Sequence, residues 1–97
     1  MFKIIIAESV YLELNEAAMY YESKQLDLGL KFILDWEEAT HHLKVSPLLF
    51  QKKHKQFRSI QLKYFPYVLI YEIEGMEIYV YRLSHSHRNP KKIFKRT

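Results

Sequence analysis

The second half of the chain alternates apolar and polar positions with the period of two that is typical of β-strands. β-branched and aromatic residues run from Tyr67 to Ile73 and again from Glu77 to Leu83, and Glu74-Gly75 between them suits a tight turn. A third alternating run, from Phe57 to Tyr64, precedes a bend at Phe65-Pro66. The pattern predicts three antiparallel strands in a meander.

The last of these strands changes phase along its length. Ile78 and Val80 share one parity, but the next apolar residue, Leu83, has the other. One extra residue near Tyr81 or Arg82 would account for the change, so the pattern predicts a β-bulge there. A bulge re-aims the side chains around it. The titratable residues affected are Arg82, His85, His87 and Arg88.

The first half of the chain begins with a short apolar run and continues with a helical period. Residues 2–7 are apolar at nearly every position, which favours a strand in the interior of a sheet. Apolar residues then recur at helical spacing over residues 10–21, behind Ser9 as a cap, and over residues 32–43, behind Asp27. Two consecutive helices are therefore predicted. The acidic residues expected to face solvent on the first are Glu13, Glu16 and Glu22.

These elements follow one another in the order β-α-α-β-β-β, which predicts an α+β fold forming a single domain over residues 1–97. Because both helices fall between the first strand and the meander, we expect a two-helix hairpin packed on one face of a mainly antiparallel four-stranded sheet, with the other face partly open. Gly29 at the start of the second helix predicts close helix packing. Residues 48–56 have no clear period and are expected to form a loop.

The formal charge of +4 is unevenly distributed. Residues 1–47 carry four Lys and Arg against eight Asp and Glu, whereas residues 48–97 carry eleven against three. The basic residues bracket an aromatic-rich sheet instead of lying along one exposed helix, which favours contact with nucleic acid or an acidic protein. A solvated surface without a partner is the alternative.

Composition also narrows the class of protein. The chain has no cysteine, which excludes a disulfide framework and a thiolate metal site. It has neither a signal-peptide pattern nor an apolar run of the roughly 18 residues that a membrane span requires. We therefore expect a soluble, cytoplasmic protein that makes no membrane contact. His41 and His42 are interpreted as surface residues, and neither a metal nor another cofactor is expected.

Short motifs occur in the order of the predicted elements. They are Ala18-Met19-Tyr20-Tyr21-Glu22, Leu28-Gly29 followed by Phe32, Pro47, Phe65-Pro66-Tyr67, Tyr71, Ile78, Val80, and His85-Ser86-His87-Arg88-Asn89-Pro90. Together they resemble the RelE/ParE superfamily of bacterial toxins over nearly the whole chain. The resemblance implies the toxin of a type II toxin-antitoxin system, of the plasmid stabilisation or addiction kind. A cognate antitoxin would hold it inactive by wrapping across its helices and sheet, in a toxin-antitoxin hetero-oligomer; a homo-oligomer is a further alternative.

The superfamily divides by mechanism. RelE-type toxins cleave messenger RNA on the ribosome with a cluster of basic residues. Their arginine falls here on Val68, and their lysines fall on Ser59 and Gln61, which cannot stabilise an anionic transition state. ParE-type toxins bind DNA gyrase, and their FPY and HxxRxP motifs are closer to this chain. The resemblance implies a ParE-like growth inhibitor that is not an enzyme. The alternatives are a ribosome-dependent mRNA endoribonuclease (an mRNA interferase) and a non-toxic member that binds only its antitoxin.

Candidate site residues form two sets. If the protein were a ribonuclease, catalysis would fall to Arg58, Arg82, His85 and Arg88. If it docks on a target, the contacts would come from Lys52, Lys53, His54, Lys55, Tyr79, Tyr81, His87, Lys91, Lys92 and Arg96. Histidine titrates near neutral pH and arginine binds phosphate, so we expect His85 and either Arg82 or Arg88 to reach a common anion. Alternatively, His85 organises the fold and the strand tyrosines serve packing.

Overall fold

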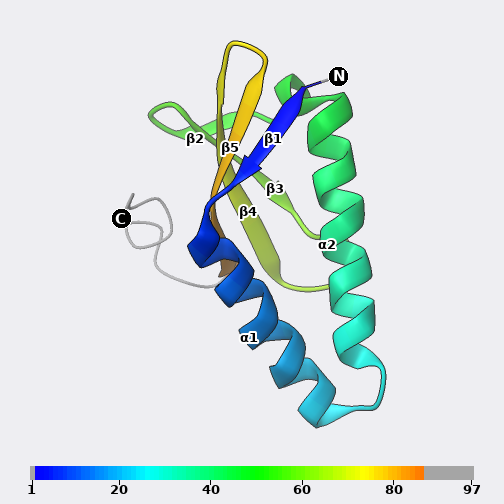
Figure 1. Ribbon diagram of the computed structural model, residues 1–97. Helices are drawn as coiled ribbons and strands as arrows, with labels where there is room; N and C mark the ends of the chain where they lie inside the picture. The colour runs from blue at the N-terminus through cyan, green and yellow to red at the C-terminus, as the bar shows by residue number, and fades with distance from the viewer. Residues whose placement is uncertain (1, 87–97) are drawn as a thin grey trace.

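A computed structural model describes residues 2–86, apart from the side chains of Lys53 and His54. The elements in chain order are β1 (Lys3–Ile6), α1 (Glu8–Lys24), α2 (Leu28–Val45), the 3-10 helix η1 (Pro47–Leu49), β2 (Lys52–His54), β3 (Phe57–Gln61), β4 (Tyr67–Glu74) and β5 (Glu77–His85). The helices α1 and α2 form an antiparallel hairpin on one face of the sheet (Figure 1). The predicted α+β architecture is confirmed, and each of the four predicted strands is present.

The strands form one sheet in the order β1-β5-β4-β3-β2, with β1 parallel to β5 and the other pairs antiparallel. The prediction that the first strand lies in the interior of the sheet is wrong, because β1 is an edge strand. The apolar character of β1 is explained by packing against the helices and not by an interior position in the sheet. Ile4 and Ile6 pack against the core beneath the helices, and the Phe2 N–H donates to the Lys44 carbonyl at the end of α2 at 3.1 Å. The helix thus partly covers this edge.

The segment expected to be a loop, residues 48–56, contains most of η1 and the short strand β2. In β2, Lys52 pairs with Arg58 and His54 pairs with Phe57, with a register shift between them. This three-residue strand adds a fifth member to the sheet beyond the four that were predicted. It is too short for a period of two to appear in the sequence, and its pairing with β3 is what defines it.

The predicted hairpin and its bulge are both present in β4 and β5. Ile70 pairs with Arg82 and Tyr71 pairs with Val80, which leaves Tyr81 as the extra residue. Gly75 in the connecting turn has a φ of 62°, a conformation that a side chain disfavours. The phase change in the sequence therefore located the bulge.

The first helix starts without the predicted cap. The residue before α1 is Ala7, and Ser9 lies inside the first turn, so the assignment of Ser9 as N-cap is wrong. The chain passes directly from β1 into α1, and the Ala7 carbonyl accepts a hydrogen bond from the Val10 N–H at 2.9 Å. Ala7 alone separates β1 from α1 and holds the N-cap position, but its methyl side chain has no oxygen with which to cap the helix.

The start of α2 is stabilised by a side chain of α1. Asp27 precedes the helix, as predicted, but has a φ of 68° and makes no side-chain cap. Instead, the Glu22 carboxylate accepts hydrogen bonds from the N–H groups of Asp27 and Gly29, each at 3.0 Å. A Cβ at Gly29 would lie 2.7 Å from the Ala18 carbonyl oxygen. The predicted close packing at Gly29 is confirmed, and Glu22 is engaged in the helix connection.

The main core lies between the helices and the sheet. Its buried residues are Val10, Leu14, Ala17, Phe32, Trp36, Ala39, Leu43, Ile60, Leu62, Leu69, Tyr71, Ile78, Val80 and Leu83. Aromatic rings from distant segments meet in it, with Phe32 5.0 Å from both Phe65 and Tyr67. A smaller cluster around Phe57 and Ile70 is buried on the opposite face of the sheet, which we call the far face. Across residues 2–86, no helix is long and apolar enough to cross a membrane.

Candidate functional site

The far face of the sheet carries the three positions that the resemblance assigns to the cationic residues of RelE-type toxins. Gln61 pairs with Val68 and Ser59 pairs with Ile70, so Ser59, Gln61 and Val68 share this face. They line a hollow of about 540 Å³, which we call the far-side hollow, together with Leu49, Phe50, Gln51 and Ile60. None of these side chains is ionisable. Among the described residues, the lining therefore includes no charged group that could hold a phosphate or transfer a proton.

Arg58 lies on the opposite face of β3 and makes a structural hydrogen bond. Its Nη1 donates to the Phe50 carbonyl at 2.7 Å, which ties the segment after η1 to the sheet. Arg58 pairs with Tyr71, whose hydroxyl donates to the Pro47 carbonyl at 2.6 Å. Burial raises the pKa of Tyr71 to about 12, although the nearby charge of Arg58 acts in the opposite direction. Arg58 is not among the residues that line the pocket next to His85, another catalytic candidate.

Arg82 lies where β5 passes beyond the end of β1. Its Nη2 is 3.5 Å from Glu13 Oε2, and the same carboxylate accepts the Leu83 N–H through Oε1 at 3.1 Å. The expectation that Glu13 faces solvent is therefore wrong. β1 pairs with β5 only as far as Val80. Beyond that point, the Glu13 carboxylate of α1 accepts the Leu83 N–H that a longer β1 strand would otherwise accept.

His85 is the last residue of β5, as predicted. It pairs with Tyr67, and the two rings are edge to face with centroids 5.3 Å apart. The adjacent pocket, of about 320 Å³, is lined by Glu13, Glu16 and Tyr20 of α1 as well as by these two rings. Two carboxylates beside an imidazole make this pocket a poor host for a phosphate. The predicted anion shared by His85 and Arg82 stays a prediction, and Arg88 lies outside the described residues.

Tyr79 and Tyr81 are half-buried on the far face of β5, each with a carboxylate partner. The Tyr79 hydroxyl donates to Glu77 at 2.7 Å, and the Tyr81 hydroxyl donates to Glu72 at 2.5 Å. The hydrogen bond to Glu77 raises the pKa of Tyr79 to about 12. The two rings are stacked with centroids 6.5 Å apart. They form a fixed aromatic surface and also take part in cross-strand packing.

The basic members of the predicted target-binding set are only partly described. Lys52 in β2 and Lys55 in the following turn are exposed. Lys53 and His54 belong to β2, but their side chains are outside the described part of the structure. The remaining predicted contacts, His87, Lys91, Lys92 and Arg96, also lie outside the described residues. Lys52 and Lys55 thus place part of this set at the β2 end of the sheet.

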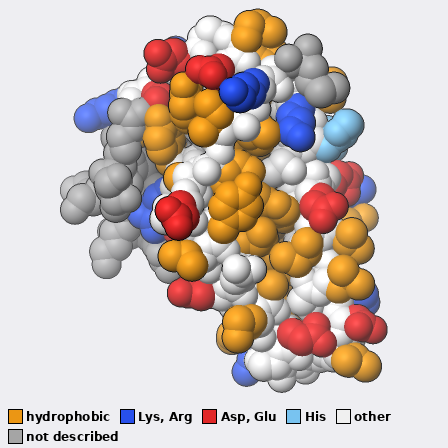
Figure 2. All heavy atoms as spheres, viewed as in Figure 1, with side chains coloured by type: hydrophobic (Ala, Val, Ile, Leu, Met, Phe, Trp, Pro, Cys, Tyr) orange, Lys and Arg blue, Asp and Glu red, His pale blue; other side chains and the backbone are white. Residues whose placement is uncertain are grey.

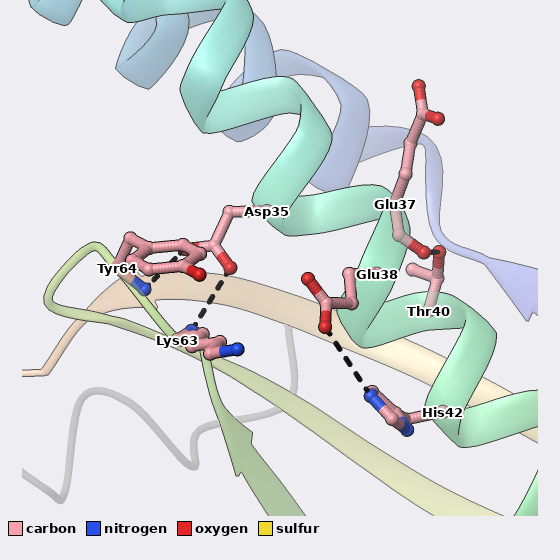
Figure 3. Close-up of polar contacts among 7 residues, drawn as sticks. All are labelled: Asp35, Glu37, Glu38, Thr40, His42, Lys63 and Tyr64. Carbon is pink, nitrogen blue, oxygen red and sulfur yellow. Dashed lines mark hydrogen bonds and ion pairs between the residues drawn. The ribbon is translucent and has the colours of Figure 1, made fainter.

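Sequence reasoning missed a buried carboxylate that shapes the surface beside α2. Asp35 is only 3% exposed, and it accepts hydrogen bonds from the N–H groups of Lys63 and Tyr64 at 3.1 and 2.8 Å (Figure 3). It also accepts the Phe65 N–H at 3.2 Å. It thereby holds the turn between β3 and β4 against α2. A hollow of about 460 Å³ lies between Leu28 and Leu34 of α2 and this turn. The sequence contained one signal of this buried carboxylate, namely an acidic residue next to Trp36 within the apolar stripe of the second helix.

The helical hairpin also exposes large apolar side chains. Figure 2 shows apolar groups gathered over the seam between α1 and α2 and along α2. The large apolar side chains that are at least half exposed on the helices and the turn between them are Leu12, Met19, Tyr20, Leu26, Leu30, Leu34 and Val45. Exposed apolar groups that gather on one surface are typical of regions that bind another protein.

Comparison with known proteins agrees with this arrangement. The sequence profile of the family described as "ParE toxin of type II toxin-antitoxin system, parDE" matches residues 4–90. The chain belongs to the ParE toxin family. A solved structure described as "Chromosomal ParDE TA system from P. aeruginosa" has the same fold, with a TM-score of 0.76 and 17% sequence identity over 88% of this chain and 96% of that chain. No curated protein sequence matches.

Family membership makes this chain the toxin of a type II toxin-antitoxin pair. The RelE/ParE resemblance seen in the sequence is confirmed, and a cognate antitoxin follows as the partner. The profile spans both helices, the meander and the HxxRxP motif that ends at Pro90.

Proposed function

We propose that this ParE-family toxin arrests growth by binding DNA gyrase in the cytoplasm and is not a ribonuclease. The observation that carries the proposal is the far-side hollow, where Ser59, Gln61 and Val68 lie together and none of the described lining residues is ionisable. Cleavage of RNA requires groups that transfer protons and stabilise a charged phosphorane. Two of the described candidates for those roles have polar partners, because Arg58 bonds to the Phe50 carbonyl and Arg82 contacts Glu13. The third, His85, packs edge to face against the Tyr67 ring.

Docking on the target would use the basic and aromatic surface from Tyr79 to Arg96, together with the basic residues 52–55. Tyr79 and Tyr81 are held rigidly by Glu77 and Glu72, and rigid aromatic side chains bind at a low entropic cost. Residues 48–97 carry eleven basic against three acidic side chains, which attract an acidic partner. The antitoxin would neutralise the toxin by covering part of this surface.

Expression of the toxin without its antitoxin tests the proposal. We expect growth arrest, inhibition of DNA supercoiling by purified gyrase, and intact ribosome-bound messenger RNA. The double variant Lys91→Glu, Lys92→Glu should weaken gyrase inhibition roughly tenfold, about 1.4 kcal/mol of binding free energy. Lys24→Glu at the end of α1 is the matched control, because it reverses a charge far along the chain from the proposed surface.

Two other results would contradict the proposal, and each would favour one of the alternative functions. Cleavage of messenger RNA at defined codon positions, abolished by His85→Ala, would make the protein a ribosome-dependent endoribonuclease. Normal growth, with both RNA and supercoiling unaffected, would make it a non-toxic member that binds only its antitoxin.

A further inference from the structure

The outer edge of β1 carries main-chain groups that point out of the sheet. β1 is the end strand of the sheet and pairs with β5 on its inner side. The Lys3 and Ala7 N–H groups donate to carbonyls on the β5 side, at 2.9 and 3.0 Å. Successive residues of a strand direct their main-chain groups to opposite sides. The N–H and C=O groups of Ile4 and Ile6 therefore point away from β5.

Little of the described chain covers this edge. In Figure 1, β1 lies at the front of the sheet, and no helix or other strand passes in front of it. The end of α2 reaches the edge at Phe2, whose N–H bonds to the Lys44 carbonyl before the strand begins. Among the described residues, no strand or loop bonds to the outward groups of Ile4 and Ile6. Such groups are a template on which another strand can pair.

The sequence of β1 makes this edge complementary to a second copy of itself. Ile5 is half-buried and pairs with Tyr79 of β5, so its side chain lies on the far face. If two copies of β1 pair in antiparallel fashion about Ile5, each Ile5 faces its own copy and Ile4 of one chain faces Ile6 of the other. Residues with outward main-chain groups then face one another, and each such pair can exchange two hydrogen bonds.

The charges at the two ends of β1 favour this register. Lys3 is exposed at the start of the strand, and Glu8 is exposed just past its end. Pairing about Ile5 places Lys3 opposite Ala7 of the other copy and close to its Glu8, so opposite charges approach. The two lysines are then roughly 13 Å apart along the strand, beyond the Debye length of about 10 Å. Pairing about Ile4 would halve this separation and bring the two lysines together.

We propose that the toxin associates with a second copy of itself through β1, in an antiparallel pairing about Ile5 that joins the two sheets into one. The pairing has two-fold symmetry, so the same residues of both copies form the interface. Tyr79, which belongs to the proposed target-binding surface, is the β5 partner of Ile5. The dimer would therefore carry two copies of that surface on one continuous sheet.

Sedimentation of the full-length toxin without its antitoxin tests the proposal. We expect a particle of twice the mass of one chain, with a Kd in the micromolar range because the interface is a single pair of strands. Ile5→Lys places like charges opposite each other and should raise the Kd at least about tenfold. Leu34→Lys, a similar change at an exposed position of α2, is the matched control and should leave the Kd unchanged. Circular dichroism verifies that both variants are folded.

A mixture of two variants tests the register. Ile5→Glu alone should also be a monomer, for the same reason as Ile5→Lys. Mixed in equal amounts, the two variants should restore the dimer, because the opposed side chains then carry opposite charges. A wild type that stays monomeric at every concentration, or a mixture that does, would overturn the proposal. A dimer that persists in Ile5→Lys would place the interface elsewhere and would overturn it as well.

Hydrogen exchange provides a measurement on the unmodified toxin. Exchange of the Ile4 and Ile6 amides should slow at least about tenfold as the toxin concentration rises, because cross-strand hydrogen bonds protect them. The Lys3 and Ala7 amides already donate to the β5 side and should not change. A dimer without added protection at Ile4 and Ile6 would contradict strand pairing. Neither antitoxin nor gyrase is present in these assays, so failure of the proposed function would not alter their results.

Discussion

The Asp35 carboxylate, buried in α2, accepts a hydrogen bond at 2.8 Å from the main-chain N–H of Tyr64 in the turn between β3 and β4. The same carboxylate also accepts the N–H groups of Lys63 and Phe65. One side chain therefore satisfies three main-chain donors that lie 28 to 30 residues away along the chain. It joins the helical layer to the meander at the point where the FPY motif begins.

Asp35→Ala should destabilise the fold by about 2–4 kcal/mol, because it leaves three partly buried donors without their charged acceptor. Asp35→Asn keeps one acceptor oxygen and should cost less. Urea unfolding followed by circular dichroism measures both, with Glu37→Ala on the exposed side of the same helix as the control. A loss for Asp35→Ala no larger than that of the control would show that the turn does not depend on Asp35.

Glu13 makes two contacts that can be separated by substitution. Glu13→Gln retains an oxygen for the Leu83 N–H but loses the charge opposite Arg82, so we expect a loss of about 0.5 kcal/mol. Glu13→Ala removes both contacts and should cost about 1–2 kcal/mol. The difference between the two variants in thermal unfolding reports the value of the main-chain contact. If both cost the same, the ion pair with Arg82 dominates.

Gly29→Ala should destabilise the protein, although alanine favours helices. The added Cβ would lie 2.7 Å from the Ala18 carbonyl oxygen, a main-chain atom that cannot move without shifting α1. We expect a loss of about 1–3 kcal/mol in the free energy of unfolding. Leu30→Ala, at the next and exposed position, is the control. An increase in stability, as helix propensity alone would give, would contradict the close approach of the helices.

The pKa of Tyr71 predicts a loss of stability at alkaline pH. Burial raises the pKa of its phenol to about 12 in the folded protein, whereas the unfolded chain has a tyrosine pKa of about 10. The folded state therefore favours the neutral phenol. Its contribution is complete below pH 10 and is lost as the pH rises to about 12, at no more than about 1.4 kcal/mol per pH unit.

Tyr71→Phe should reduce this pH dependence and, at neutral pH, should cost about 1 kcal/mol through the lost bond to the Pro47 carbonyl. Unfolding measured at several pH values from 8 to 12 provides the test, with Tyr64→Phe at an exposed position as the control. An unchanged alkaline slope in Tyr71→Phe would assign the effect to another group.

Features that depend on a local period of apolar residues could be predicted from the sequence. The hairpin and its turn at Gly75 follow from runs of alternating residues, and the bulge at Tyr81 follows from the phase change after Val80. Both helices follow from their apolar stripes. The neutral residue at position 68 was also visible in the sequence, and with it the main argument against ribonuclease chemistry. Each of these signals lies within one or two neighbouring elements.

The contacts between polar groups, in contrast, depend on how the elements pack together. Glu13 was read as a solvent-facing residue because its helical position allowed that, but the end of β1 left the Leu83 N–H in need of an acceptor. Asp35 likewise meets main-chain donors almost thirty residues away. The edge position of β1 and the existence of β2 also depend on which strands pair. The apolar and polar pattern of so short a segment does not indicate its pairing partner. Contacts between distant residues are set by the packing of whole elements, so residue order alone did not specify them.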